Sequence, residues 1–312
     1  MGLPEEIVLA DGTLNDRLIL KKEPLYQGMN GKFVERFYLS ETESYIFKPL
    51  TNNDQLGKEA WINEHVLRVF PAIFPKIISY SKHDHPEFSW MILEDLGPLL
   101  HEFTEESVLG VVKWMAWWHS LPLESFPDVP VSGLKPKRDQ LISDICRDKG
   151  KFMAMLPDLM LEEQSIERIY EYLDSFIFSK TLVLSHGDLH VGNYALADGR
   201  IVILDWEHAH TNTPFWDLYH LLDMSHPIFP KEIRAEFRER ALRYYLEQVE
   251  LELDAEAFTR EYHLFSCVFS IWMILLIVKD LSADDGKWSK EQLERQLNET
   301  VLSLRECAQY LV

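Results

Sequence analysis

The segment from residue 182 to 222 constrains the fold of this 312-residue chain more than any other stretch. Its sequence is LVLSHGDLHVGNYALADGRIVILDWEHAHTNTPFWDLYHLL. Two short apolar runs in this region, Thr181 to Leu184 and Arg200 to Leu204, have the composition of β-strands. The dipeptide Asp198-Gly199 is typical of a tight hairpin turn leading into the second strand. The region therefore predicts strands whose ends carry polar loops.

Oxygen-bearing side chains follow the end of each predicted strand. Asp188 and Asn193 lie in the loop after the first strand, five positions apart, and Asp205 directly follows the second strand. Carboxylate and amide oxygens are ligands that suit Mg²⁺. Phosphoryl transfer from ATP needs such a set, because one Asp accepts the proton of the acceptor hydroxyl while an Asn and an Asp hold metal on the phosphates.

The pattern H-G-D-L-H-x-x-N, followed by hydrophobic residues and D-W-E, resembles the aminoglycoside phosphotransferase and choline kinase-like family, whose members are relatives of the protein kinases. The resemblance implies ATP-dependent phosphorylation of a small-molecule hydroxyl with Mg²⁺. It implies that Asp188 is the catalytic base and that Asn193 and Asp205 are the Mg²⁺ ligands. It also implies that Asp217 bonds the backbone of the catalytic loop and that Glu207 lies near metal or substrate.

A lysine upstream supports the same interpretation. Lys48 stands in the β-type run Tyr45-Ile46-Phe47-Lys48, and a lysine at a strand end can pair with the α- and β-phosphates of a nucleotide. In the family such a lysine pairs with a glutamate on the next helix. Glu64 lies sixteen residues further on and Glu59 eleven. Spacing slightly favours Glu64, and the helix phase does not decide between them.

Two further segments correspond to nucleotide-binding elements of the family. The turn Gln27–Lys32 contains Gly28 and Gly31, whose backbone amides could approach phosphates, although it lacks the full G-x-G-x-x-G pattern. The run Trp90–Gly97 (WMILEDLG) resembles the connection between lobes against which adenine stacks. The residues whose backbone would bond the adenine edge are Leu93, Glu94, Asp95 and Leu96.

The distribution of strand-like and helix-like segments predicts a two-lobed, protein kinase-like α+β fold. Residues 1–96 contain short β-type runs and one helical segment, Leu56–Phe70. Gly97-Pro98 marks the boundary. Residues 97–312 are mostly helical, and they carry the catalytic loop and, by resemblance, the helices that bind the substrate.

Histidines in the loop leave other interpretations open. We expect His186 and His190 to support the loop rather than to take part in chemistry. The triplet His186-x-Asp188-x-His190 would nevertheless suit zinc, and the alternative function is then a metal-dependent hydrolase. A third hypothesis is a non-catalytic kinase-like binding module, which the intact set of site residues argues against.

Composition restricts the partners. With 31 Lys plus Arg and 51 Asp plus Glu, the formal net charge is −20, which argues against nucleic acid as a partner. The longest apolar run, Cys267–Val278, is shorter than the roughly 20 residues that span a bilayer, so we expect a buried helix and no membrane association. The N-terminus lacks the pattern of a signal peptide. Three widely spaced cysteines fit a reducing cytoplasm, and the oligomeric state stays open.

The acceptor is expected to be a small molecule with a hydroxyl group, with a preference for a cationic one. Acidic residues at and beyond the predicted site would attract an amine if they faced it. Those beyond the catalytic loop and D-W-E are Asp217, Asp223, Asp280, Asp284 and Asp285. The sequence does not choose among aminoglycosides, choline-like alcohols, sugars and amino alcohols, nor between ATP and GTP.

Overall fold

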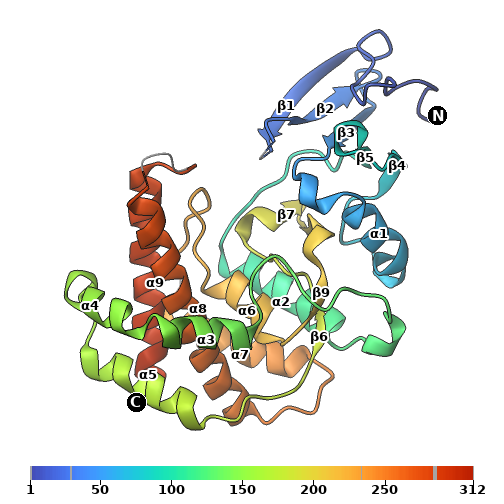
Figure 1. Cartoon of the computed structure of the whole chain (residues 1–312). Coiled ribbons are helices and arrows are strands. Elements are labelled where there is room, and N and C mark those ends of the chain that lie inside the picture. Colours follow the sequence, from blue (N-terminus) through green and yellow to red (C-terminus); the bar gives the residue numbers. More distant parts are fainter. Residues whose placement is uncertain (1, 29, 233, 284–286, 312) are drawn as a thin grey trace. The chain divides into compact units, whose positions relative to one another are not determined.

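The computed structural model describes the chain in four stretches, namely residues 2–28, 30–232, 234–283 and 287–311 (Figure 1).

Contacts within the chain divide it into two compact units. Unit 1 comprises Met1–Leu100 and Ala195–His208, and unit 2 comprises His101–Tyr194 and Ala209–Val312. The division expected after residue 96 stays a prediction. No pattern in the sequence indicated that the short stretch carrying Asp205 packs with the N-terminal residues.

Unit 1 is built on an antiparallel sheet with the strand order β1-β2-β3-β5-β4. Alternating apolar residues direct Phe37, Phe47 and Ile92 into one core, where they are 3% exposed or less, because successive side chains of a strand point to opposite faces. The strands are β1 (Lys21–Gln27), β2 (Phe33–Tyr38), β3 (Ser44–Pro49), β4 (Ile77–Tyr80) and β5 (Trp90–Glu94).

A helix and a hairpin complete unit 1. Helix α1 (Lys58–His65) packs against the short 3-10 turn Trp206–His208. The hairpin pairs β7 (Tyr194–Ala197) with β8 (Arg200–Ile203). Its turn residues Asp198 and Gly199 have φ values of 49° and 73°, as a type I′ turn requires. The predicted hairpin turn is confirmed, and α1 is brought beside the D-W-E segment.

Unit 2 is mostly helical. The antiparallel pair β6 (Val183–Ser185) and β9 (His210–Asn212) is its small sheet. Helix α8 packs against α9 and α3, and α2 packs against α7. The helices are α2 (Glu105–His119), α3 (Arg138–Arg147), α4 (Lys149–Leu159), α5 (Glu163–Ser175), α6 (Phe215–Leu222), α7 (Ala235–Gln248), α8 (Ala255–Leu281) and α9 (Lys290–Tyr310).

Helix α8 is long and apolar enough to cross a membrane, but 61% of its most apolar stretch is buried within the structure. Two polar residues near its beginning are also buried and bonded. Glu261 accepts hydrogen bonds from the Ser179 amide at 3.0 and 3.1 Å, and His263 Nε2 lies 2.8 Å from a Glu239 oxygen. Since these partners belong to unit 2, α8 is a core helix, as the sequence predicted.

The predicted α+β class is confirmed, with a small antiparallel sheet in the N-terminal part and a helical C-terminal part. One detail differs. Strand β1 was not expected, although its turn to β2 was. Helices α3 and α4 follow one another directly but are separate helices, because the chain leaves helical geometry at Asp148, whose ψ is 12°.

Candidate active site

One buried carboxylate holds the loop that follows β6. Asp217, in the first turn of α6, accepts hydrogen bonds from the amides of His186 at 2.8 Å and Gly187 at 3.1 Å. The Ser185 hydroxyl donates to the same carboxylate at 2.7 Å. Gly187 has φ 90°, a conformation that strongly favours glycine. Asp217 thus contacts the loop backbone at two amides, which agrees with the contact that the resemblance implies.

Asp217 also contacts a histidine of another helix. His119 of α2 places Nε2 3.2 Å from Asp217 Oδ2. Burial alone would raise the pKa of Asp217, but the bonds from His119 and Ser185 and the nearby His186 hold it below its ordinary value. A buried carboxylate that stays ionised is a strong acceptor, so Asp217 fixes the conformation of the loop.

Asp188 lies in the loop that Asp217 supports. Its Oδ1 is 2.7 Å from Lys135 Nζ and its Oδ2 is 3.6 Å from His190 Nε2. Asn193 donates from Nδ2 to the backbone oxygen of Asp188 at 2.8 Å and so closes the loop. Burial would raise the pKa of Asp188, but Lys135, followed by His190, holds it well below its ordinary value. The carboxylate is therefore ionised and able to accept a proton.

Each of the two loop histidines caps a backbone amide with Nδ1. His186 Nδ1 accepts from the Asp188 amide at 3.3 Å, and His190 Nδ1 accepts from the Gly192 amide at 3.0 Å. Burial lowers the pKa of His190 to about 3, so its ring is neutral at pH 7. Both contacts agree with the expected supporting role of the two side chains.

A zinc site at this loop finds no support. In the described parts of the chain, one group of three potential metal-ligand side chains brings its ligand atoms within 4.8 Å of one another, and it consists of Glu59, Asp205 and Glu207. Three carboxylates without histidine or cysteine are hard oxygen donors, which favour Mg²⁺ over zinc.

Two of these three carboxylates, Glu59 and Asp205, share one lysine. Lys48 Nζ is 2.5 Å from Glu59 Oε2 and 2.8 Å from Asp205 Oδ1. Asp205 has φ 59°, an uncommon conformation for a residue with a side chain and one that recurs at functional sites. Glu207 belongs to the same group, and its Oε1 lies 3.3 Å from His208 Nε2. Sequence positions 48, 59 and 205 thus meet at one point.

The partner of Lys48 corrects the expectation that favoured Glu64. Glu64 instead accepts a hydrogen bond from the Tyr80 hydroxyl at 2.6 Å. Helix α1 begins only at Lys58, so Glu59 lies in its first turn and packs towards the D-W-E turn. Burial raises the pKa of Glu59, and Asp205 adds to this effect while Lys48 opposes it. Burial opposes the charge on Lys48, but Asp205 and Glu59 raise its pKa above the ordinary value.

The glycine turn between β1 and β2 uses its amides internally. The Gly28 amide donates to the Lys32 oxygen at 2.8 Å and the Gly31 amide donates to the Gly28 oxygen at 3.1 Å. The Asn30 side chain donates to the Leu50 oxygen at 2.7 Å. A Cβ on Gly28 would lie 2.4 Å from the Thr51 side chain, so glycine permits this close approach. In this conformation the two amides are paired, and a role towards phosphates stays a prediction.

Part of the segment expected to bond adenine belongs to the sheet, where its backbone groups are hydrogen-bonded. Leu93 pairs with Ile46 of β3, and the Glu94 amide donates to the Lys76 oxygen at 2.9 Å. Asp95 forms an ion pair with Arg36, with Arg36 Nε 2.7 Å from Asp95 Oδ2. The roles proposed for Leu93, Glu94, Asp95 and Leu96 towards adenine therefore stay predictions, and the Asp95 side chain has a structural contact.

A cavity of about 400 Å³ in unit 1 lies beside Lys48 and the carboxylates around it. Lys48, Glu59 and Glu207 line it on one side. Aromatic rings line it as well, those of Trp61, Tyr80 and Trp90. The cavity therefore combines a cation, carboxylates and aromatic surface.

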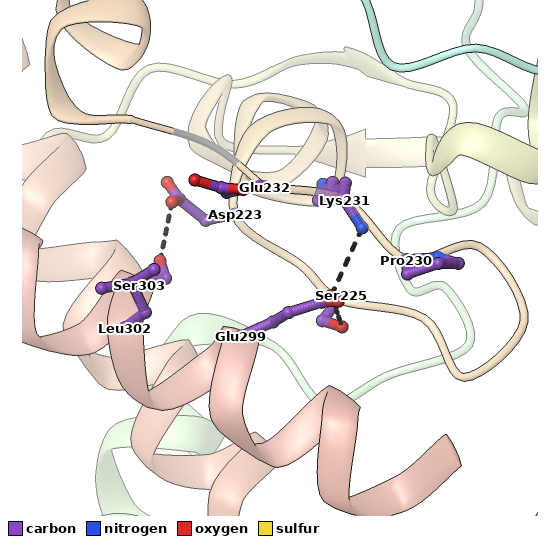
Figure 2. Close-up of a pocket in the computed structure, with 8 residues that line it drawn as sticks. All are labelled: Asp223, Ser225, Pro230, Lys231, Glu232, Glu299, Leu302 and Ser303. Atoms are coloured by element: carbon purple, nitrogen blue, oxygen red, sulfur yellow. Dashed lines mark hydrogen bonds between the residues drawn. The ribbon is translucent and has the colours of Figure 1, made fainter. Parts of the chain in front are cut away.

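A second cavity, of about 340 Å³, lies in unit 2 beside α9 and holds none of the predicted site residues. Figure 2 shows Asp223 bonded to Ser303, and Glu299 bonded to Ser225 and to Lys231. Burial lowers the pKa of Lys231 to about 7. The acids around this cavity are engaged within the protein.

The acids expected to attract a cationic acceptor are less available than the sequence suggested. Asp217 and Asp223 are buried, and Asp223 is paired with Arg238 at 2.6 Å. Asp280 is exposed at the end of α8. Asp284 and Asp285 lie outside the described residues.

The sequence did not predict that Lys135, His220 and His226 lie around Asp188. Lys135 comes from the loop before α3, and His220 of α6 lies 3.1 Å from it through Nε2. His226 stacks on His190 with ring centroids 4.5 Å apart. No periodicity or motif marks these residues, because their proximity to Asp188 depends on the packing of distant segments.

The profile of the phosphotransferase enzyme family matches residues 85–262, more than half of the chain. The chain therefore belongs to this family, and its class of reaction is phosphoryl transfer to a hydroxyl group of a small molecule. A search of curated protein sequences found no match.

Solved structures share the fold. A mutant of aminoglycoside 2′-phosphotransferase IIIa in complex with GDP aligns with a TM-score of 0.60 at 16% identity, over 91% of this chain and 92% of that one. Choline kinase from Cryptosporidium parvum aligns with 0.56 at 17% identity, over 94% and 90%. Macrolide 2′-phosphotransferase from Brachybacterium faecium aligns with 0.53 at 14% identity, over 92% and 93%. At these identities the comparison shows the kinase-like fold.

Proposed function

We propose that this chain transfers the γ-phosphoryl group of ATP, with Mg²⁺, to a hydroxyl group of a small molecule. The observation that carries the proposal is the ion pairing of Lys48 with both Glu59 and Asp205, beside Glu207. In a phosphotransferase, a lysine held in this way is suited to nucleotide phosphates. One lysine among three carboxylates also leaves an excess of negative charge, which suits a divalent cation.

The donor chemistry fits Mg²⁺. Asp205 is proposed as a ligand with Glu207 beside it, and Asn193 is retained from the family resemblance as the other ligand. When bound, Mg²⁺ would neutralise charge on the phosphates during transfer. Glu59 is proposed to keep Lys48 in place rather than to bind metal, since it already contacts the ammonium group.

Asp188 is proposed as the catalytic base. Its ionised carboxylate accepts the proton of the acceptor hydroxyl as the acceptor oxygen bonds to the γ-phosphorus. Asn193 holds the backbone at Asp188, and Asp217 holds the amides just before it. Because phosphoryl transfer has a loose transition state, positioning and charge stabilisation supply most of the catalysis.

The finer features of the substrate belong to the same proposal. A preference for a cationic acceptor is supported by the net charge of −20, and by structures whose names include choline kinase and a streptomycin–ATP complex of a phosphotransferase. The three cysteines are free, which agrees with action in the cytoplasm.

The test is a panel assay of ADP or GDP release by the purified chain. Amino sugars, amino alcohols, neutral sugars and hydroxy acids are each supplied with ATP or GTP and Mg²⁺, and Asp188→Asn is the control. We expect nucleotide turnover that depends on one acceptor class, with a phosphorylated product seen by mass spectrometry. Nucleotide binding without transfer to any acceptor would favour the binding module instead, and zinc-dependent hydrolysis would favour the hydrolase.

A further inference from the structure

Lys135 is the cation closest to the proposed base, and it comes from a segment that carries no motif. It lies in the loop that joins the 3-10 turn Leu123–Ser125 to α3. Its Nζ is 2.7 Å from Asp188 Oδ1, and each of the two side chains is 16% exposed. A pair this close and this shielded from water interacts more strongly than a surface ion pair.

The loop that carries Lys135 is fixed within unit 2. The Thr211 amide of β9 donates to the Pro130 oxygen at 2.8 Å. A Cβ on Gly133 would lie 2.4 Å from the His210 ring, so the backbone passes directly over β9. After Lys135, Arg138 donates to the Ser179 oxygen at 3.1 Å. The lysine is thus delivered by a packed segment, not by a free surface loop.

His220 fixes the position of the ammonium group. His220 Nδ1 lies 2.7 Å from the Trp216 oxygen, and a carbonyl only accepts, so Nδ1 carries the proton. His220 Nε2 is then an acceptor, and Lys135 Nζ lies 3.1 Å from it. Burial lowers the pKa of His220, which keeps the ring neutral and able to accept. The fully buried His220 therefore holds Lys135 against Asp188.

An ammonium group has three N–H donors. One points to Asp188 Oδ1 and one to His220 Nε2, and the third has no partner among the residues that the structure describes. Asp188 Oδ2 has His190 Nε2 at 3.6 Å, beyond ordinary hydrogen-bond distance. An acceptor hydroxyl that donates to Oδ2 would bring its oxygen near the remaining N–H of Lys135.

We propose that Lys135 is a further catalytic residue, which donates a hydrogen bond to the oxygens that gain negative charge as the phosphoryl group is transferred. This inference rests on the proposed function. The acceptor O–H bond breaks and its proton passes to Asp188. The acceptor oxygen bonds to the γ-phosphorus, the bond from that phosphorus to the β–γ bridging oxygen breaks, and ADP leaves with the electron pair. Lys135 keeps its three protons throughout.

The position of Lys135 also restricts the acceptor. A positive group directly beside the reacting hydroxyl would be repelled by the ammonium group, whereas oxygen atoms there would be attracted. Any cationic group of the acceptor therefore lies away from the hydroxyl that receives the phosphoryl group.

The test compares Lys135→Met with Lys135→Arg and with the matched control Lys137→Met, which changes an exposed lysine two residues further on. We expect Lys135→Met to lower kcat by about 100-fold, the usual effect of losing one donor to a developing charge. The Kd for nucleotide should stay unchanged. Lys135→Arg should recover part of the loss, since it keeps the charge, and Lys137→Met should stay within about twofold of wild type.

A pH profile separates chemistry from structure. Removal of Lys135 takes away the nearest cation that lowers the pKa of Asp188, so the acidic limb of kcat/KM should move to higher pH in Lys135→Met. Wild-type kcat with an unmoved limb would overturn the inference, and so would a loss that thermal denaturation traces to unfolding. If the wild-type chain itself binds nucleotide but transfers phosphate to no acceptor, the proposed function fails first, and this inference fails with it.

Discussion

Two sets of carboxylates, one around Lys48 in unit 1 and one in unit 2, are stabilised in different ways. In unit 1, Glu59 and Asp205 share Lys48 while Glu207 lies beside them, and the pKa of Glu59 is raised by burial. In unit 2, three acids each have their own donors: Lys135 for Asp188, Arg238 for Asp223, and two loop amides with Ser185 for Asp217. The pKa values of these three acids are lowered.

This difference between the two sets of acids suits them to two different functions. Acids whose charge is already balanced can hold a loop in one conformation, or can keep a base ionised near neutral pH. Carboxylates that outnumber the neighbouring cations repel one another until a further cation binds. Unit 2 is therefore suited to positioning and proton transfer, and the group in unit 1 is suited to binding Mg²⁺ with nucleotide.

The largest effect is expected from Asp188→Asn. The change keeps the shape of the side chain but removes the proton acceptor, so turnover should fall by about 10²–10⁴-fold. Nucleotide affinity, measured by calorimetry, should stay near wild type because the change leaves unit 1 intact. A variant that keeps wild-type turnover would show that Asp188 is not the base.

The next effect concerns stability. Asp217→Ala leaves two loop amides and the Ser185 hydroxyl without their acceptor, and the free energy of unfolding should fall by about 3–5 kcal/mol. In unit 1, Glu207→Gln should change it by less than about 1 kcal/mol, since it removes one of three acids that repel one another. Urea denaturation measures the change in the free energy of unfolding for each variant. Equal decreases in the two variants would contradict the proposed difference between the two sets of acids.

Two titratable groups, His226 in unit 2 and Glu59 in unit 1, should make stability depend on pH with opposite sign. Burial lowers the pKa of His226 to about 4 from an ordinary 6.5, so the unfolded state binds this proton more readily. The stability that the neutral ring provides is full above pH 6.5 and is lost as pH falls towards 4, by up to about 3 kcal/mol. The raised pKa of Glu59 has the opposite effect, because here the folded state binds the proton more readily than the unfolded state. The free energy of unfolding therefore falls as pH rises above about 4.5.

Denaturation at pH 5 and pH 8, without divalent cations, separates the two contributions. His226→Phe should flatten the rise in stability between these values, and Glu59→Gln should steepen it. The account of burial at His226 would be contradicted if His226→Phe left the difference between pH 5 and pH 8 unchanged.

The features of the site that the sequence predicted are local ones. The loop with Asp188 and Asn193, the hairpin turn at Asp198 and the position of Asp205 all lie within one continuous segment. There, strand composition and turn chemistry determine the backbone. The contact of Asp217 with the loop was implied by the family resemblance alone, not by local patterns.

Contacts between distant segments were not predictable. The choice of Glu59 over Glu64 depends on where α1 begins and on its packing against Trp206–His208. Lys135 is 53 positions from Asp188, and only the packing of its loop on β9 brings it there. Hydrophobic periodicity records which face of an element is buried, and it carries no information about which loop covers a site.

The most direct test of the central claim is the thermal stability of the chain with ATP, with and without Mg²⁺. At 100 times Kd, bound nucleotide should add about 2.7 kcal/mol to the free energy of unfolding, which raises Tm by a few degrees in a chain of this length. The account predicts that the shift requires Mg²⁺, shrinks in Asp205→Asn and persists in Asp188→Asn. No shift with any purine nucleotide at millimolar concentration, or an equal shift without Mg²⁺, would contradict it.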